Sequence, residues 1–322
     1  MHVQNRSFDI ISKESSNMKR FSKLIPDCTI LIVGLGLMGA AYAKALSQKG
    51  YRVLGITRSR EVIDAALADG TIAMGDTQIN ESLIKQANII IFGLYPTVMI
   101  DWVKDNGHLI PTGTLITDVT GVKGCVVDEV QRLLPQGVEF ISAHPMAGKE
   151  LMGSGKLDVY RAATPDMFRG ANYLVVPTDK NTPEAILICE QLGRLLGFGQ
   201  ITQLSVEEHD RMIAYLSQLT HAIAVSLMCC AGEGSDRDAA PDLARLARLT
   251  GDSFRDLTRI AKINDAMWAE LFLSNRDALL EQMDLFSERF SALRNALADG
   301  DEESMRAMMK TSTQRRIGFD KQ

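Results

Sequence analysis

The chain has 322 residues, of which 46% are hydrophobic, and its 35 basic and 40 acidic side chains give a formal net charge of −5. This length is sufficient for two domains with substantial cores. Because there is no overall basic field and no uninterrupted apolar run of roughly eighteen residues, we expect neither a nucleic-acid nor a membrane partner. Five cysteines without a CxxC pair or a metal-like spacing to histidine predict no metal site and a reducing, cytoplasmic location.

The first part of the chain is expected to be α/β. Residues 1–27 contain no apolar core and are interpreted as an extension, not a secretory signal. From residue 28 to about residue 204, short apolar runs alternate with helical patterns, as in βαβ units. Strands are expected at residues 29–33, 51–56, 87–94, 113–119, 138–142, 172–176 and near Ile201, and helices at 37–49 and 183–196. Continuous apolar strands of this kind predict a parallel sheet covered on both faces.

Residues 205–322 have a different pattern, and nothing after Thr202 is typical of a strand. Helical spacing of apolar residues predicts helices at 206–231, 241–249, 254–263, 265–274 and 276–298. We therefore predict a Rossmann domain followed by an all-α domain, which we expect to pair two copies into a homodimer.

A glycine fingerprint lies between the first strand and the first helix. Gly34-Leu35-Gly36-Leu37-Met38-Gly39 has the G-x-G-x-x-G spacing in the strand-to-helix context that dinucleotide binding requires. Gly34 permits the tight turn, Gly36 lets backbone N–H groups approach a pyrophosphate, and Gly39 lets the helix pack closely on the sheet.

The end of the second strand indicates which dinucleotide is bound. Thr57-Arg58-Ser59 stands where NAD enzymes usually place a carboxylate, and no acidic residue occurs before Glu61. Arg58 suits a ribose 2′-phosphate, with hydroxyl donors from Thr57 and Ser59. We predict NADP as the cofactor, with NAD as the alternative.

His144 precedes a proline directly after an apolar, strand-like run. Since a residue before proline is pushed out of the α region, we expect His144 at the carboxyl end of a strand, where ligands bind to open parallel sheets. A histidine there is suited to take a proton beside a nicotinamide, because its ordinary pKa is near physiological pH.

The run from His144 to Glu150 reads HPMAGKE and resembles the HPMAGxE signature of the prephenate dehydrogenase family. Three further segments follow in the family's order: Glu208-His209-Asp210, Gln218-Leu-Thr-His221, and Asp256-Leu-Thr-Arg259-Ile-Ala261 with the later Trp268. The similarity extends from about residue 28 to about residue 290.

The resemblance implies oxidative decarboxylation of prephenate to 4-hydroxyphenylpyruvate, with hydride transfer to NAD(P)+, in tyrosine biosynthesis. It implies that His144 is the base and that Arg259 holds the ring carboxylate. His221 is placed near the substrate side chain, and His209 and Glu150 in the surrounding polar network. Trp268 is expected to line the pocket.

The chain departs from the family at three positions. Many relatives read SHLPH where this chain has Ser217-Gln218-Leu219-Thr220-His221, and some carry a serine at the position of Gly121 that orients the catalytic histidine. Thr120 is the candidate substitute for that serine.

Several alternatives stay open at this point. Arogenate, the amino analogue of prephenate, would undergo the same chemistry, and a 4-amino analogue is a third candidate. A dinucleotide-binding sensor without turnover is the non-enzymatic alternative. β-Hydroxyacid dehydrogenases share the layout but use a lysine on the interdomain helix, and residues 206–231 contain no lysine.

Overall fold

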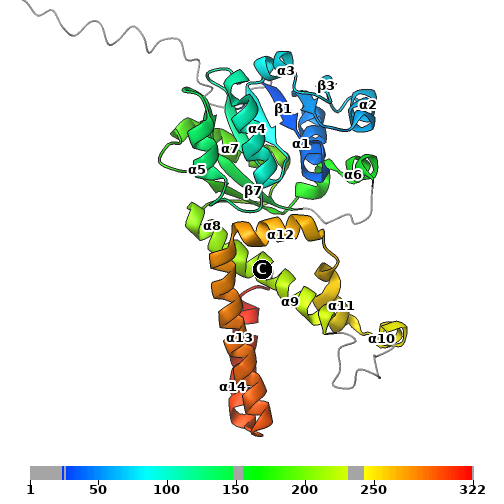
Figure 1. The fold of residues 1–322 in the computed structure, drawn as a ribbon, viewed down its shortest axis with the longest axis vertical. Coiled ribbons are helices and arrows are strands. Elements are labelled where there is room, and N and C mark those ends of the chain that lie inside the picture. The colour runs from blue at the N-terminus through cyan, green and yellow to red at the C-terminus, as the bar shows by residue number, and fades with distance from the viewer. Residues whose placement is uncertain (1–23, 25–26, 148–154, 231–242, 321–322) are drawn as a thin grey trace, which may run out of the picture. The chain divides into compact units, whose positions relative to one another are not determined.

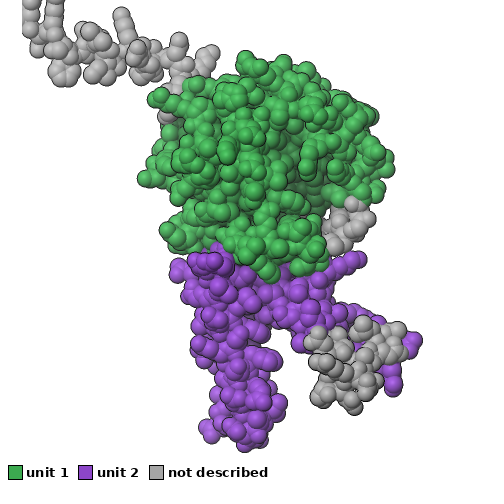
Figure 2. Space-filling model, in the orientation of Figure 1, with its two compact units in different colours: residues 1–210, 263–274 green, residues 211–262, 275–322 purple. Residues whose placement is uncertain are grey.

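The computed structural model describes residue 24 and residues 27–147, 155–230 and 243–320. The chain divides into two compact units, Met1–Asp210 with Ile263–Ser274, and Arg211–Lys262 with Asn275–Gln322 (Figure 2).

The first unit contains a six-stranded parallel sheet in the order β3-β2-β1-β4-β5-β6. Its strands β1 and β3 are labelled in Figure 1. Its strands are β1 (Thr29–Val33), β2 (Arg52–Ile56), β3 (Met74–Asp76), β4 (Ile89–Phe92), β5 (Leu115–Asp118) and β6 (Glu139–Phe140). The helices of the βαβ connections are α1 (Leu37–Gln48), α2 (Arg60–Ala68), α3 (Glu81–Gln86), α4 (Pro96–Asn106) and α5 (Val127–Leu133). This strand order is that of a Rossmann domain, so the predicted fold class is confirmed.

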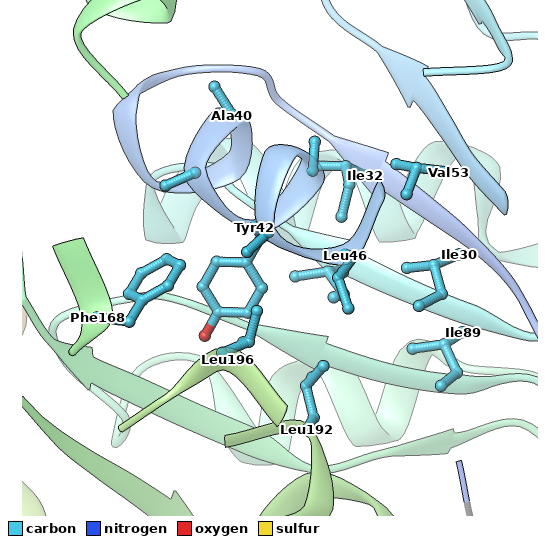
Figure 3. Packing of buried hydrophobic residues seen from close by; sticks show 14 of the residues in the cluster. Ile30, Ile32, Ala40, Tyr42, Leu46, Val53, Ile89, Phe168, Leu192 and Leu196 are labelled. Carbon is cyan, nitrogen blue, oxygen red and sulfur yellow. The ribbon is translucent and has the colours of Figure 1, made fainter. Parts of the chain in front are cut away.

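Both faces of the sheet are buried because the central strands are apolar, β1 from Ile30 to Val33 and β4 throughout. On one face, Ile30 and Ile32 pack against Tyr42 and Leu46 of α1 (Figure 3). The opposite face carries a second cluster in which Leu31, Val33 and Ile90 join Met99 and Val103 of α4. Alternating residues of β1 therefore serve two separate cores, as a parallel sheet with helices on both faces requires.

A second sheet of three strands has the order β7-β8-β9, with β7 (Ser142–Met146), β8 (Asn172–Val176) and β9 (Gln200–Gln203). It is accompanied by α6 (Lys156–Ala162) and α7 (Pro183–Leu196). β7 is antiparallel to β8, and His144 is paired with Leu174 in its middle. The expectation that His144 ends a parallel strand was therefore wrong. Pro145 does not stop the strand because β7 is at the edge of this sheet, where a residue without an N–H is tolerated.

The second unit is helical throughout its described residues. It comprises the end of α8 (Val206–Ile213), a π-helical turn (Ala214–Gln218), α9 (Leu219–Cys229), α10 (Leu243–Leu249), α11 (Asp252–Thr258), a 3₁₀ turn (Arg259–Ala261), α13 (Arg276–Ala298) and α14 (Glu302–Ile317). α9 packs on α11 and on the 3₁₀ turn, and α13 packs on α14. The predicted start of a helix at Pro241 lies outside the described residues, and α14 was not predicted.

α12 (Asp265–Ser274) is the helix that the contacts assign to the first unit, although the predicted domain boundary put it in the second. Its Glu270 carboxylate accepts the backbone N–H of Thr97 at 2.9 Å, which caps the start of α4. An acidic group at this position is favourable because helix N-termini carry partial positive charge.

The helical stretch Val206–Cys229 is long and apolar enough to cross a membrane by length and composition, and an 18-residue window within it has a mean hydropathy of 1.4. The stretch contains no uninterrupted apolar run of that length because Ser217, Gln218, Thr220 and His221 lie within it. Core helices of globular proteins pass the same test, so this observation alone is weak evidence for a membrane span.

Candidate active site

The turn after β1 is built from glycines for steric reasons. Gly34 has φ +95°, and a Cβ added there would lie 2.5 Å from the carbonyl oxygen of Gly93. A Cβ on Gly39 would overlap the carbonyl oxygen of Gly34. β1, β4 and the first turn of α1 therefore approach each other at distances that only glycine allows, as the fingerprint predicts.

The start of α1 has the properties of a phosphate cradle. Gly36 is the N-cap, no side chain caps the helix, and its first turn carries no acidic residue. Gly36 is exposed, and a Cβ placed on it would meet nothing within 4 Å. Free N–H groups, a helix dipole and open space together suit a dinucleotide pyrophosphate. Leu35 is buried beneath this turn, whereas Leu37 and Met38 are half-buried.

The turn after β2 presents three polar side chains. Arg58 is exposed, and within the described part of the chain its guanidinium has no hydrogen-bond or ion-pair partner. Ser59 is the N-cap of α2, yet its hydroxyl makes no capping hydrogen bond. By contrast, Arg60 donates to the Thr77 hydroxyl at 3.3 Å. Arg58 and Ser59 are thus available to a ligand, while Arg60 is already engaged.

A chain of hydrogen bonds joins β7 to α8. Nδ1 of His144 lies 2.9 Å from Nε2 of His209, and Nδ1 of His209 lies 2.7 Å from Oδ1 of Asp210. The Asp210 carboxylate also accepts the backbone N–H groups of Lys123 (2.9 Å) and Gly124 (2.7 Å). His209 is fully buried, and His144 is half-buried.

A buried ion pair lies at the carboxyl end of β5. Lys123 and Asp118 are completely buried, with Nζ 3.0 Å from Oδ2. Lys123 also donates to the Ala143 carbonyl at 2.7 Å, while Asp118 accepts the Ala143 N–H at 3.0 Å and the Ser142 hydroxyl at 2.6 Å. The pair therefore holds both backbone polar groups of the residue that precedes His144.

Burial lowers the pKa of both histidines in this site. For His144 the pKa is well below its ordinary value, through burial first and then through the charges of His209 and Lys123. For His209, burial lowers the pKa against the opposing effect of the hydrogen bond to Asp210. Burial alone would raise the pKa of Asp210, but hydrogen bonds from His209 and from backbone N–H groups keep it below the ordinary value. The site thus holds two neutral imidazoles beside an ionised carboxylate.

The other predicted residues occupy different places. The Thr120 hydroxyl bonds Asp118 and the Val122 carbonyl, so it is part of the ion-pair network. Trp268 is buried on α12 and contacts Phe272 edge to face, with ring centroids 5.5 Å apart. Glu150 lies outside the described residues.

Two predicted substrate residues belong to the second unit. Nδ1 of His221, on α9, lies 2.8 Å from the Ser217 carbonyl and therefore donates to it. Arg259 is exposed and begins the 3₁₀ turn that packs against α9. The fold thus places these two residues on neighbouring elements of one unit.

Comparison with known proteins identifies the family. The model of the prephenate dehydrogenase nucleotide-binding domain matches residues 42–197, and the model of its dimerization domain matches residues 205–311. The chain belongs to the prephenate dehydrogenase family. It is an NAD(P)-dependent oxidoreductase, as predicted, and the dimerization domain supports the predicted homodimer.

Several members of the prephenate dehydrogenase family are similar over most of their length. The prephenate dehydrogenase of Bacillus subtilis is 32% identical over 300 residues, covering 90% of this chain and 76% of that protein. The cyclohexadienyl dehydrogenase of Zymomonas mobilis is 28% identical, covering 90% and 95%. A crystal structure of prephenate dehydrogenase from A. aeolicus with hydroxyphenyl propionate and NAD+ has a TM-score of 0.81 at 25% identity, covering 92% of this chain and 100% of that one.

Sequence reasoning missed four residues of this prephenate dehydrogenase site, namely Gly93, Asp118, Ser142 and Asp210. Asp210 stood in the quoted segment Glu208-His209-Asp210, next to a histidine, and that adjacency was the available signal. Gly93 follows β4 and Asp118 ends β5, at the carboxyl edge where ligands bind to parallel sheets, whereas Ser142 begins β7 and carried no such signal.

Proposed function

We propose that this enzyme oxidises and decarboxylates prephenate to 4-hydroxyphenylpyruvate in the cytoplasm, as a homodimer. The observation that carries the proposal is His144, a half-buried neutral imidazole whose Nδ1 is already engaged by His209, which leaves Nε2 for the substrate. A relative from A. aeolicus has been crystallised with hydroxyphenyl propionate and NAD+, a ring compound and a cofactor compatible with this chemistry.

The proposed reaction balances without another reactant. His144 Nε2 accepts the proton of the 4-hydroxyl as the C4–H bond breaks, and the bound nicotinamide takes the hydride. The bond to the ring carboxylate then breaks, carbon dioxide leaves, and its electron pair makes the ring aromatic. The phenolate oxygen finally recovers the proton from His144. A base positioned in this way contributes about 10²- to 10⁴-fold to the rate.

Substrate anchoring is assigned to the second unit and to α12. We assign Arg259 to the ring carboxylate because its exposed guanidinium is a planar fork of donors. His221 is proposed to lie near the side chain of the substrate, Glu150 to belong to the surrounding polar network, and Trp268 to contribute an apolar wall. The segments 28–204 and 205–322 remain the proposed cofactor and substrate domains.

For the cofactor we propose NADP, with NAD as the alternative. The glycine turn and the N-terminus of α1 fit the pyrophosphate, and Arg58 and Ser59, whose side chains are unengaged among the described residues, fit a 2′-phosphate. Relatives do not share one preference, since a yeast relative is named as NADP-dependent whereas the A. aeolicus structure contains NAD+.

The proposal is tested by following the absorbance of the reduced nicotinamide with prephenate or arogenate, each with NADP+ or NAD+. We expect turnover of prephenate with NADP+ and its loss in His144→Asn, whereas Glu207→Gln, on the exposed side of α8, retains the activity of the unmodified enzyme. Preference for arogenate would replace prephenate by its amino analogue as the substrate and leave His144 as the proposed base. Binding of NADP+ without turnover of either substrate would replace the proposal by the sensor alternative.

A further inference from the structure

We infer that Asp210 and His209 are positioning residues that hold His144 in the tautomer protonated on Nδ1, so that Nε2 presents a lone pair to the substrate hydroxyl. We name Asp210, His209 and His144 the relay. The inference rests on the proposed role of His144 as the base, and it states which part His209 plays in the polar network predicted around the substrate.

The surroundings of Asp210 determine which nitrogen of His209 carries the proton. An ionised carboxylate only accepts hydrogen bonds, and Asp210 accepts two backbone N–H groups, from Lys123 and Gly124, in addition to His209. Those backbone donors cannot rotate away or deprotonate, so Asp210 has no geometry in which it donates to His209. Nδ1 of His209 must therefore carry a hydrogen.

The tautomer of His209 in turn determines the tautomer of His144. A neutral imidazole has one N–H and one lone pair, so His209 with a protonated Nδ1 has a lone pair on Nε2. That nitrogen lies 2.9 Å from Nδ1 of His144, which must then be the donor. The lone pair of His144 is left on Nε2, the nitrogen that the proposed proton transfer requires.

The competing assignment, a doubly protonated His209, is disfavoured by its surroundings. The groups that act on His209 are the carboxylates of Asp210 and Asp118, the Lys123 ammonium and the imidazole of His144. The side chain is fully buried, and burial lowers its pKa in spite of the two carboxylates. A neutral His209 keeps every hydrogen bond of the relay without adding a second buried cation beside Lys123.

The relay has particular importance in this chain because of Gly121. Some relatives carry a serine there, which by family resemblance orients the catalytic histidine. The hydroxyl of Thr120, the predicted substitute, donates instead to the Asp118 carboxylate and the Val122 carbonyl. Among the described residues, His209 is the side chain that hydrogen-bonds the imidazole of His144.

The relay also explains how His144 would tolerate the proton that it gains. Imidazolium formation on His144 strengthens the hydrogen bond to His209, which is in turn polarised by the Asp210 carboxylate. A buried carboxylate at the end of such a chain stabilises the cation without accepting its proton, as in the Ser-His-Asp triad. Loss of the correct tautomer in that triad reduces kcat by about 10⁴-fold, which indicates the scale of the effect expected here.

The direct test is the tautomer of His144, read from ¹⁵N chemical shifts of histidine-labelled full-length protein at neutral pH, with His144→Gln assigning the signal. We expect the Nδ1–H tautomer in the unmodified protein. The Nε2–H tautomer would overturn the inference. This measurement needs no turnover, so it decides the relay even if neither prephenate nor arogenate is oxidised and the proposed function fails.

Three variants extend the test to catalysis. In Asp210→Asn the side-chain NH2 group must take the place of one carboxylate oxygen. In one orientation it faces the N–H of Gly124, and in the other it faces the N–H of Lys123 and Nδ1 of His209. Either orientation disturbs the hydrogen bonds of the relay. We expect kcat to fall about 100-fold or more with the KM for NADP+ unchanged. His209→Gln offers His144 an amide oxygen and should retain more kcat than His209→Leu, which has a similar volume but no acceptor.

Glu207→Gln is the matched control, since Glu207 is an exposed neighbour on the same helix. Tight NADPH binding and an unchanged dimer size confirm folding of each variant before its kcat is compared. Unchanged kcat in Asp210→Asn, or equal kcat in His209→Gln and His209→Leu, would show that the relay does not orient the base.

Discussion

The ammonium group of Lys123 donates a hydrogen bond to the carbonyl oxygen of Ala143, the residue before His144, with Nζ 2.7 Å from that oxygen. Asp118 accepts the N–H of the same residue, and the two side chains pair with each other at 3.0 Å. The outer edge of β7 is therefore held at this residue by a buried ion pair and not by a neighbouring strand. Removing one partner of such a pair is costly because the other is left as an uncompensated buried charge.

Lys123→Met should consequently destabilise the protein strongly. The substitution leaves Asp118 without its cation and the Ala143 carbonyl without its donor, and we expect the free energy of unfolding to fall by about 3–5 kcal/mol. Urea denaturation followed by circular dichroism measures this change. The double variant Lys123→Met with Asp118→Asn removes both charges and should recover part of the loss. A single variant as stable as the unmodified protein would contradict the assigned role.

Acidification should destabilise the fold through His209, which is buried, and His144, which is half-buried. The pKa values of His144 and His209 are lowered by burial in the folded state, whereas both histidines titrate near 6.5 when unfolded. Below about pH 6.5 the unfolded chain binds protons that the folded chain does not. The free energy of unfolding therefore falls as the pH is lowered, until the folded-state pKa values are reached. Each histidine contributes at most about 1.4 kcal/mol per pH unit in this window.

The comparison that isolates this effect is the unfolding free energy at pH 7.5 and at pH 5.5. Lys123, Asp118 and Asp210 surround the two imidazoles and also influence the titration. A His144→Gln/His209→Gln double variant keeps these charged groups but removes the two titrating rings, so its stability should depend less on pH. Equal pH dependence of the two proteins would show that the histidines are not held neutral.

The elements that the sequence predicted well have strong local patterns. β1, β4 and β8 are continuous apolar runs, and α7 begins at a proline and ends at Gly197 with φ +91°, so local signals are sufficient for these elements. α14 was missed because its side chains are mostly exposed and its start depends on the Asp301 cap and on packing against α13.

The relay and the ion pair depend on contacts that no local pattern shows. Asp210 reaches the N–H of Lys123 across 87 positions in the chain, and Asp118 reaches Ala143 across 25. The placement of His144 was wrong for a related reason. Proline predicts a strand end from local sterics, but the edge position of β7 is a property of the assembled sheet.

Arg58→Ala should change the choice of nicotinamide cofactor. If the free guanidinium binds the 2′-phosphate, its loss should raise the KM for NADP+ about 10- to 100-fold, the value of a hydrogen bond to a charged group, and leave the KM for NAD+ unchanged. Arg60→Ala is the matched comparison and should have a smaller effect, because Arg60 is engaged with Thr77. Equal KM changes for both cofactors in Arg58→Ala would exclude recognition of the 2′-phosphate by this residue.

Gly121→Ser should be tolerated, although it restores a side chain that some relatives carry. A Cβ at Gly121 would lie 3.5 Å from Cδ2 of Leu271, an ordinary contact, and the backbone does not have a positive φ. We expect the free energy of unfolding to change by less than about 1 kcal/mol. Gly39→Ser is the contrasting variant, since its Cβ would overlap the Gly34 carbonyl and should abolish NADP+ binding. Because the relay already engages Nδ1 of His144, kcat in Gly121→Ser should stay close to that of the unmodified enzyme. A large gain in kcat would mean that His209 orients the base poorly and that the serine supplies what this chain lacks.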